Sequence, residues 1–201
     1  MTPLLTRGRM YVAVFTTLYL VGFSVWFLSN GNYEFIGYIA TMLVFIGVIV
    51  GTLRTSQLSD RMLWLLSLWG LLHMLGGGLR IDGHVLYAQI LYPFHVDGDF
   101  TYLKYDQVVH AFGFGVAAAA IHGIVARMAP TMRTFGRIML PALASMGLSV
   151  VNELIEFTAV ILLPNTWVGG YYNLSLDLVS NTVGAFAAVL ILELWRLKKR
   201  G

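Results

Sequence analysis

Two glutamates one helical turn apart, Glu153 and Glu156, lie in an apolar run long enough to cross a membrane. An ionisable side chain at that depth costs roughly 2.5–3.5 kcal/mol on insertion scales, so it normally marks a functional site with a partner. The i,i+3 spacing places both carboxylates on one side of a helix. Because like charges so close together cannot both ionise cheaply in a low dielectric, the pair predicts either a shared proton or a cation between them.

The composition predicts an integral membrane protein. Of the 201 residues, 58% are hydrophobic and 11% are charged, whereas a soluble domain is about 45–50% apolar and about 25% charged. The length suits one compact helical bundle, so we expect residues 1–201 to form a single transmembrane domain. Cysteine is absent, which excludes disulfides and thiolate metal ligands.

Apolar runs separated by polar turns predict an all-α fold, a polytopic membrane bundle of about six transmembrane helices. The helices are expected at residues 11–28, 35–53, 62–78, 106–128, 137–163 and 175–197. The long connection over residues 80–105 mixes acidic residues and histidines with aromatic and aliphatic ones. That mixture is typical of an interfacial or re-entrant segment, so we expect a short interfacial helix there.

The positions of lysine and arginine predict the orientation. All of them except Arg80 and Lys104 fall on one side of this topology. By the positive-inside rule that side is the cytoplasm, so both termini are expected there, in a bacterial inner (plasma) membrane. Topology therefore explains the sequence pI of about 9.3, and the expected partner is membrane lipid, with no nucleic acid.

Threading the helices alternately through the membrane brings the intramembrane ionisable residues to one end, the extracytoplasmic one. These candidate site residues are His73, Asp106, His110, Glu153, Glu156 and Asp177, with Asn152 and Asn181 in support. Small residues continue the same helix faces, namely Gly113, Ala117, Ala120, Gly184 and Ala188. Because small residues let helices pack closely in membranes, the polar faces are expected to point into the bundle.

Two imidazoles and four carboxylates match the ligands of carboxylate-bridged two-metal sites in helix bundles, although the local spacing differs from the Glu-x-x-His of those sites. The ligand types suit zinc, iron or manganese. A single zinc ion with an activated water is an equally simple interpretation. In that case Glu153 or Glu156 would act as the general base.

At these residues the chain resembles the uncharacterised YjdF-type bacterial inner-membrane family, which is itself similar to the VanZ-like proteins. The matching segments are Leu72-His73-Met74-Leu75-Gly76-Gly77, Lys104-Tyr105-Asp106-Gln107-Val108-Val109-His110-Ala111-Phe112, Asn152-Glu153-Leu154-Ile155-Glu156 and Leu176-Asp177-Leu178, followed by Gly184. The resemblance covers about residues 62–190. It transfers no established activity, and the phenotype associated with VanZ-like proteins is glycopeptide-antibiotic resistance.

Two positions depart from the family pattern. Gly78 stands where the resemblance implies histidine, and Asn173 stands where it implies aspartate. If those positions ligate in relatives, the site here has lost a ligand or borrows His84 or His95. Both of these histidines lie in the outer connection, where an interfacial or solvated role is the more common one.

Each candidate also has a purely structural interpretation. The glutamate pair could form a hydrogen-bond network between helices, Asp106 and Asp177 could be acids favoured at helix N-termini, and His73 could be a satisfied buried histidine. His122 lies about 18 Å along its helix from His110, too far to share one site, so we expect it to serve packing or an inner-leaflet contact.

Three functions follow, and the sequence does not decide between enzyme and non-enzyme. The first is a metal-dependent, hydrolase-like enzyme acting on a lipid or polyprenyl-linked substrate. The second is a non-catalytic membrane subunit or binding protein, in which a metal or hydrogen bonds staple the helices. The third, a proton-coupled carrier, needs polar groups beyond Glu153, where only Ser149 and Ser145 continue the span. The substrate, the reaction, the metal and the oligomeric state are not specified.

Overall fold

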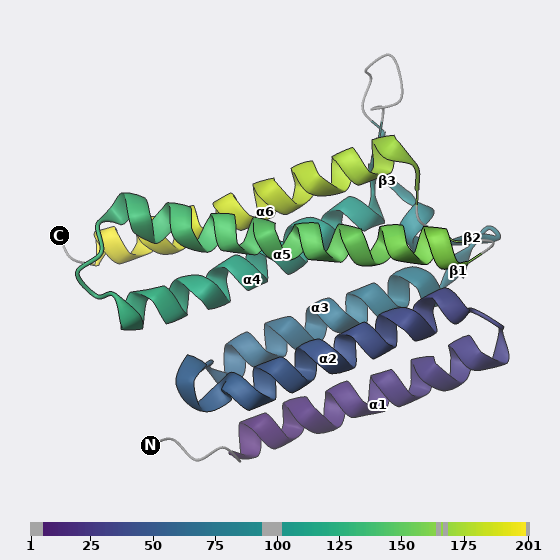
Figure 1. Cartoon of the computed structure of the whole chain (residues 1–201), viewed down its shortest axis with the longest axis horizontal. Coiled ribbons are helices and arrows are strands. Elements are labelled where there is room, and N and C mark those ends of the chain that lie inside the picture. The colour runs from purple at the N-terminus through teal and green to yellow at the C-terminus, as the bar shows by residue number, and fades with distance from the viewer. Residues whose placement is uncertain (1–5, 94–101, 164–165, 167–168, 200–201) are drawn as a thin grey trace. The chain divides into compact units, whose positions relative to one another are not determined.

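The computed structural model describes residues 6–93, 102–163, 166 and 169–199, and it divides the chain into two compact units, 1–87 and 88–201. Each unit is described by itself. Unit 1 contains α1 (Arg7–Ser29), α2 (Tyr33–Ser56) and α3 (Asp60–Gly78), which pack against one another (Figure 1). Polar side chains set where these helices begin, since Thr6, Asn32 and Ser59 each accept a backbone N–H of the first turn.

The end of α3 is glycine-rich because aromatic rings lie directly against it. A Cβ atom added at Gly77 would lie 1.9 Å from the ring of Phe35, and one added at Gly76 would lie 2.5 Å from the ring of Tyr87. His73, one turn earlier on α3, shares a short hydrogen bond from its Nδ1 with the Tyr87 hydroxyl. The glycines thus leave room for the aromatic rings of Phe35 and Tyr87, which both lie near the ring of His73.

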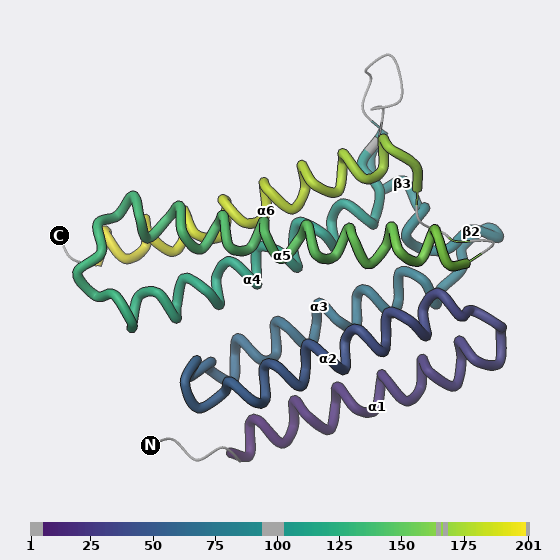
Figure 2. The backbone as a smooth tube through the Cα atoms, viewed as in Figure 1, coloured from purple at the N-terminus to yellow at the C-terminus, as the bar shows by residue number. Residues whose placement is uncertain are grey.

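The described part of unit 2 contains two strands and three long helices. They are β3 (Ile90–Pro93), β4 (Tyr102–Lys104), α4 (Tyr105–Met128), α5 (Thr134–Leu162) and α6 (Tyr171–Lys198). Figure 2 shows the α4, α5 and α6 backbones running side by side, and each contacts the other two. Following the chain, α4 and α6 run in the same direction and α5 runs opposite to them.

Small residues bring α4 and α6 into backbone contact. A Cβ atom at Gly184 would lie 1.9 Å from the carbonyl oxygen of Ala111, and one at Gly115 would lie 3.0 Å from the carbonyl oxygen of Gly184. This close approach is typical of parallel membrane helices with small-residue faces, and it confirms the inward-facing position predicted for Gly184, whereas Gly115 was not among the predicted residues.

The all-helical membrane bundle is confirmed in outline. Five of the helices, all except α3, are long and apolar enough to cross a membrane. The orientation of the termini stays a prediction. The helix bounds were less accurate: α5 begins at Thr134, so Arg137 lies inside the helix and is buried, and α6 begins at Tyr171, so Asn173 joins it.

The expected interfacial helix in the connection is wrong for its described part. The chain forms the hairpin of β1 (Arg80–Ile81) with β2 (His84–Val85), the single 3-10 turn η1 (Leu86–Ala88), and then the β3–β4 pair. Asp82 and Gly83 join β1 to β2 with positive φ angles of 50° and 82°. An Asp-Gly pair with both φ angles positive is the preferred two-residue hairpin turn, so strand pairing satisfies the backbone here instead of a helix.

Candidate functional site

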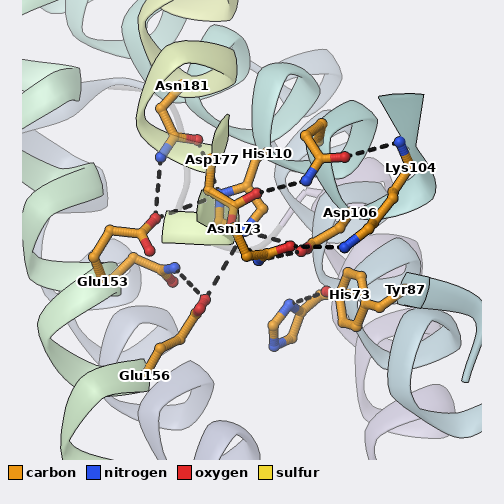
Figure 3. Close-up of polar contacts among 12 residues, drawn as sticks. His73, Tyr87, Lys104, Asp106, His110, Glu153, Glu156, Asn173, Asp177 and Asn181 are labelled. Atoms are coloured by element: carbon orange, nitrogen blue, oxygen red, sulfur yellow. Dashed lines mark hydrogen bonds and ion pairs between the residues drawn. The ribbon is translucent and has the colours of Figure 1, made fainter. Parts of the chain in front are cut away.

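His110 lies at the centre of a polar cluster formed by α4, α5 and α6 of unit 2 (Figure 3). Its Nδ1 lies 3.0 Å from Oδ1 of Asn181, and the amide group of Asn181 donates to Oε1 of Glu153 at 3.2 Å. Because the oxygen of Asn181 can only accept, Nδ1 of His110 must be the donor. This bond fixes the ring orientation and turns Nε2 toward the other acids.

Two carboxylates face Nε2 of His110 at distances too long for a hydrogen bond. Oδ1 of Asp106 lies 3.5 Å away and Oε1 of Glu156 lies 3.9 Å away, whereas N–H···O bonds span about 2.7–3.2 Å. Two ligand atoms bound tetrahedrally to one ion at about 2.1 Å lie about 3.4 Å apart. The distances around Nε2 therefore suit a metal ion bound by the ring and the carboxylates better than a direct hydrogen bond between them.

The acids are held in place by side-chain amides. Asn152 donates to Oε1 of Glu156 at 2.8 Å. Asn173 donates to Asp106 at 3.0 Å and to Asp177 at 2.6 Å, so it bridges two carboxylates from different helices. Such outer hydrogen bonds orient metal-binding carboxylates, because they leave the remaining oxygen lone pairs directed at one point.

A further layer of hydrogen bonds links the start of α4 to α6. Gln107 donates to Oδ1 of Asp177 at 3.1 Å, and its own oxygen accepts the backbone N–H of Lys104 at 2.8 Å. The ammonium of Lys104 donates to Oδ1 of Asn173 at 3.2 Å. Lys104 thus places a cation on the amide that bridges Asp106 and Asp177.

The cluster offers two overlapping groups of metal-ligand atoms. One is Asp106, His110 and Asp177, the other is His110, Glu153 and Glu156, and within each group the ligand atoms lie within 4.8 Å of one another. His110, Glu153 and Asp177 are buried, while the Asp106 and Glu156 side chains keep 16% and 14% of their surface exposed. Four acids around one imidazole carry an excess of negative charge, so the buried arrangement requires protons or a cation.

The structure brings together most of the residues predicted from the sequence. Seven of them meet in unit 2: Asp106, His110, Asn152, Glu153, Glu156, Asp177 and Asn181. Their roles as ligands or catalysts stay predictions. His73 belongs to unit 1, so its part in the cluster also stays a prediction. His84 is exposed on β2 and His95 lies outside the described residues.

Sequence reasoning missed several members of the cluster. Asn173 was considered only as a departure from a family pattern, yet its amide ties Asp106 to Asp177. Its i,i+4 spacing from Asp177 was a usable signal, since such pairs share a helix face. Gln107 and Lys104 were read only as parts of a motif, and nothing in their spacing showed that they contact residues about seventy positions later.

The sequence did not predict a second buried polar group. Glu193, on α6, accepts a hydrogen bond from Nε2 of His122 at 2.6 Å and from Nε of Arg137 at 3.1 Å. His122 was expected to serve packing or an inner-leaflet contact, and Glu193 was not considered. A charged residue in an apolar run was the available signal, the same one that singled out Glu153.

Comparison with known proteins gives one match. A family model described as "Predicted membrane protein (DUF2238)" matches residues 10–198. No curated protein and no solved structure shows a significant match to this chain.

Proposed function

We propose a function for this chain, which belongs to the DUF2238 family of predicted membrane proteins, from the chemistry of the His110 cluster. The cluster binds a divalent metal ion, and the protein is a metal-dependent, hydrolase-like enzyme that acts on a lipid or polyprenyl-linked substrate at the extracytoplasmic side of the membrane. Zinc, iron and manganese are the ions that this mixture of imidazole and carboxylate suits.

The observation that supports this most is the environment of Nε2 of His110. Asn181 occupies Nδ1, so Nε2 is the ring nitrogen left to face Asp106 and Glu156. Amide donors also contact these acids: Asn173 donates to Oδ2 of Asp106, and Asn152 donates to the Oε1 of Glu156 that faces Nε2. A purely structural network would place donors between Nε2 and the acids, whereas acceptors directed at one point are the arrangement of a metal site.

A bound divalent ion would polarise a phosphoryl or carbonyl oxygen of the substrate and activate water there. The residues of the chain supply the rest. His110 would hold the ion with Asp106 and Asp177 in one ligand group, or with Glu156 in the other, to which Glu153 also belongs. Glu153 would accept a proton as general base, since Asn181 orients its carboxylate.

The substrate class follows from position and charge. The site lies among helices long and apolar enough to cross a membrane, and Asp106 and Glu156 are the partly exposed acids. A lipid headgroup could therefore reach it. Lys104 supplies a cation beside the acids that suits an anionic phosphate on that headgroup.

The finer resemblance to YjdF-type and VanZ-like proteins is part of this proposal. Three of its four motifs contribute side chains to the His110 cluster, through Asp106 and His110, through Glu153 and Glu156, and through Asp177. Motifs that are separate in sequence and meet in one cluster support a shared site.

Metal analysis of the purified protein tests the first step. We expect at least one equivalent of zinc, iron or manganese in protein purified in detergent without a polyhistidine tag or chelator. His110→Gln should remove the metal, and His84→Gln, an exposed histidine on β2, should not. Protein that is reproducibly empty, or that keeps its metal in His110→Gln, would overturn the proposal.

The reaction is tested with a panel of polyprenyl phosphates and glycerophospholipids in detergent micelles. Product should form with the metal-loaded protein and fail to form with Glu153→Gln that retains metal. Metal retention without turnover of any substrate would favour the second candidate, a structural staple. The amide bonds that tie α4, α5 and α6 together at the cluster support that candidate.

The staple makes its own prediction. A chelator should lower the melting temperature, and Glu156→Gln should lower it similarly, with no separate loss of a chemical activity. The proton-carrier alternative has less support, because the buried apolar residues Ala118, Ala142, Ala185 and Val189 pack together farther along the bundle. Proton flux in proteoliposomes that disappears in Glu153→Gln would restore it.

A further inference from the structure

A second charged cluster occupies the other end of unit 2, where α4 ends, α5 begins and α6 ends (Figure 1). Glu193 is its centre and is only 1% exposed. It accepts hydrogen bonds from His122 and Arg137. It also accepts a hydrogen bond from Nε of Arg196 at 2.7 Å and forms an ion pair with the guanidinium group of that residue. We call these four residues the Glu193 cluster.

The Glu193 cluster is separate from the His110 cluster. His110 and His122 are twelve residues apart on α4, which corresponds to about 18 Å of helix. Ala118 on α4 and Ala185 and Val189 on α6 are fully buried between the two levels. Whatever the Glu193 cluster does, it acts apart from the proposed metal site.

The Glu193 cluster has more positive than negative charge. Two guanidiniums, Arg137 and Arg196, face one carboxylate. Within the described residues, Arg137 hydrogen-bonds only through Nε, and its two terminal amino groups are not among the fully buried atoms that lack a partner, so they reach the surface. An anion from outside the chain can therefore contact these amino groups, and guanidinium groups are well suited to bind phosphate oxygens in pairs.

The start of α5 adds donors at the same place. Arg133 precedes the helix, and its side chain makes no capping hydrogen bond. The first backbone N–H groups of a helix lack partners within it and attract anions. The terminal amino group of Arg196 reaches this point, where it donates to the hydroxyl of Thr134 at 3.3 Å. Guanidinium groups and helix N–H groups thus converge.

We propose that the Glu193 cluster and the start of α5 bind a phosphate group, carried by an anionic lipid headgroup or by free phosphate. A phosphate offers several acceptor oxygens and the negative charge that the cluster lacks. Glu193 is a positioning residue, since it holds Nε of Arg137 and of Arg196 and leaves terminal amino groups to contact the ligand. The ligand would then be held between α4, α5 and α6 at the edge of the bundle.

Native mass spectrometry of the full-length protein in neutral detergent tests the proposal with three probes. They are inorganic phosphate, a short-chain phosphatidylglycerol, and the corresponding diacylglycerol, which has no phosphate. We expect saturable binding of about one phosphatidylglycerol per protein and none of the diacylglycerol. Free phosphate that competes with the lipid identifies the phosphate itself as the ligand, and failure to compete identifies the headgroup.

The matched variants are Arg137→Lys and Arg54→Lys. Arg137→Lys keeps the charge and the ion pair to Glu193 but removes the second terminal amino group, so we expect about tenfold weaker binding. Arg54 is an exposed residue near the end of α2, and its replacement should leave binding unchanged. If Arg137→Lys does not fold, Arg196→Lys takes its place. If the unaltered protein does not bind phosphatidylglycerol, or if all variants bind it equally, the proposal is overturned. The Glu193 cluster would then only hold the helices together through its ion pairs.

Discussion

The contact between α4 and α6 can be tested with one methyl group. In Gly184→Ala the new Cβ would lie 1.9 Å from the carbonyl oxygen of Ala111, and 2.6 Å and 2.7 Å from its carbonyl carbon and Cα. Ordinary contacts of a Cβ atom begin at 3.4 Å, so the methyl group is about 1.5 Å too close. The obstructing atoms are backbone, so no side-chain rotation relieves the clash and the helices must move apart.

Overpacking of this kind costs about 1–3 kcal/mol. The matched control is Gly147→Ala on α5, where a Cβ atom would meet nothing within 4 Å. Because alanine is the better helix former by up to about 1 kcal/mol, that variant should be as stable as the original or more so. Unfolding in detergent, titrated with a denaturing detergent and followed by circular dichroism, measures both differences.

Displacement of the helices should also reach the His110 cluster. His110 on α4 and Asn181 on α6 share a 3.0 Å hydrogen bond close to this contact. We therefore expect Gly184→Ala to bind metal more weakly than Gly147→Ala, even at temperatures where both are folded. If Gly184→Ala proved as stable as Gly147→Ala and bound metal equally well, the close approach of α4 and α6 would be refuted.

Three further predictions address other contacts. Asn181→Ala should weaken metal binding by about 10–100-fold, because the bond that orients the His110 ring is lost; calorimetric titration measures this, and unchanged affinity would remove Asn181 from the site. Glu193→Gln should destabilise the protein by about 3–5 kcal/mol, because the buried Arg137 and the partly exposed Arg196 lose their counter-charge; an unchanged melting temperature would show that the Glu193 cluster contributes little. Gly77→Ala should cost about 1–3 kcal/mol, because its Cβ would lie 1.9 Å from the buried Phe35 ring. Gly47→Ala, which meets nothing within 4 Å, is the control, and equal melting temperatures would contradict the packing described for unit 1.

The His110 cluster was predictable because two strong constraints act on such a sequence. Apolar runs fix which segments are long enough to span, and the rarity of acids inside those runs singles out Glu153 and Glu156. Because successive helices cross the membrane in opposite directions, the position of a residue along its helix then predicts its depth in the membrane. That reasoning needs no side-chain detail, and it brought Asp106, His110 and Asp177 to the correct end of unit 2.

The remaining features depend on contacts that spacing does not encode. Gln107 meets Asp177, and His122 meets Glu193, only because α4 and α6 are in register, and this register is set by packing at Gly184. The starts of α5 and α6 lie three and four residues before the predicted ones, and Arg137, predicted at the first position of its helix, is buried within α5 against Glu193. The hairpin turn at residues 82–83 was a readable signal, but it was outweighed by the aromatic composition of the connection.

The matched register of α4 and α6 limits how this bundle can move. The His110–Asn181 and His122–Glu193 pairs bridge the same two helices at two heights with equal separation in sequence. Sliding α4 past α6 by one turn would break both hydrogen-bonded pairs at once, so we expect the two helices to move as one rigid unit. The third helix, α5, contains Pro141, which removes one internal hydrogen bond and permits a bend. If a helix moves to admit a lipid to the acids of α5, we therefore expect α5 to bend while α4 and α6 keep their positions relative to each other.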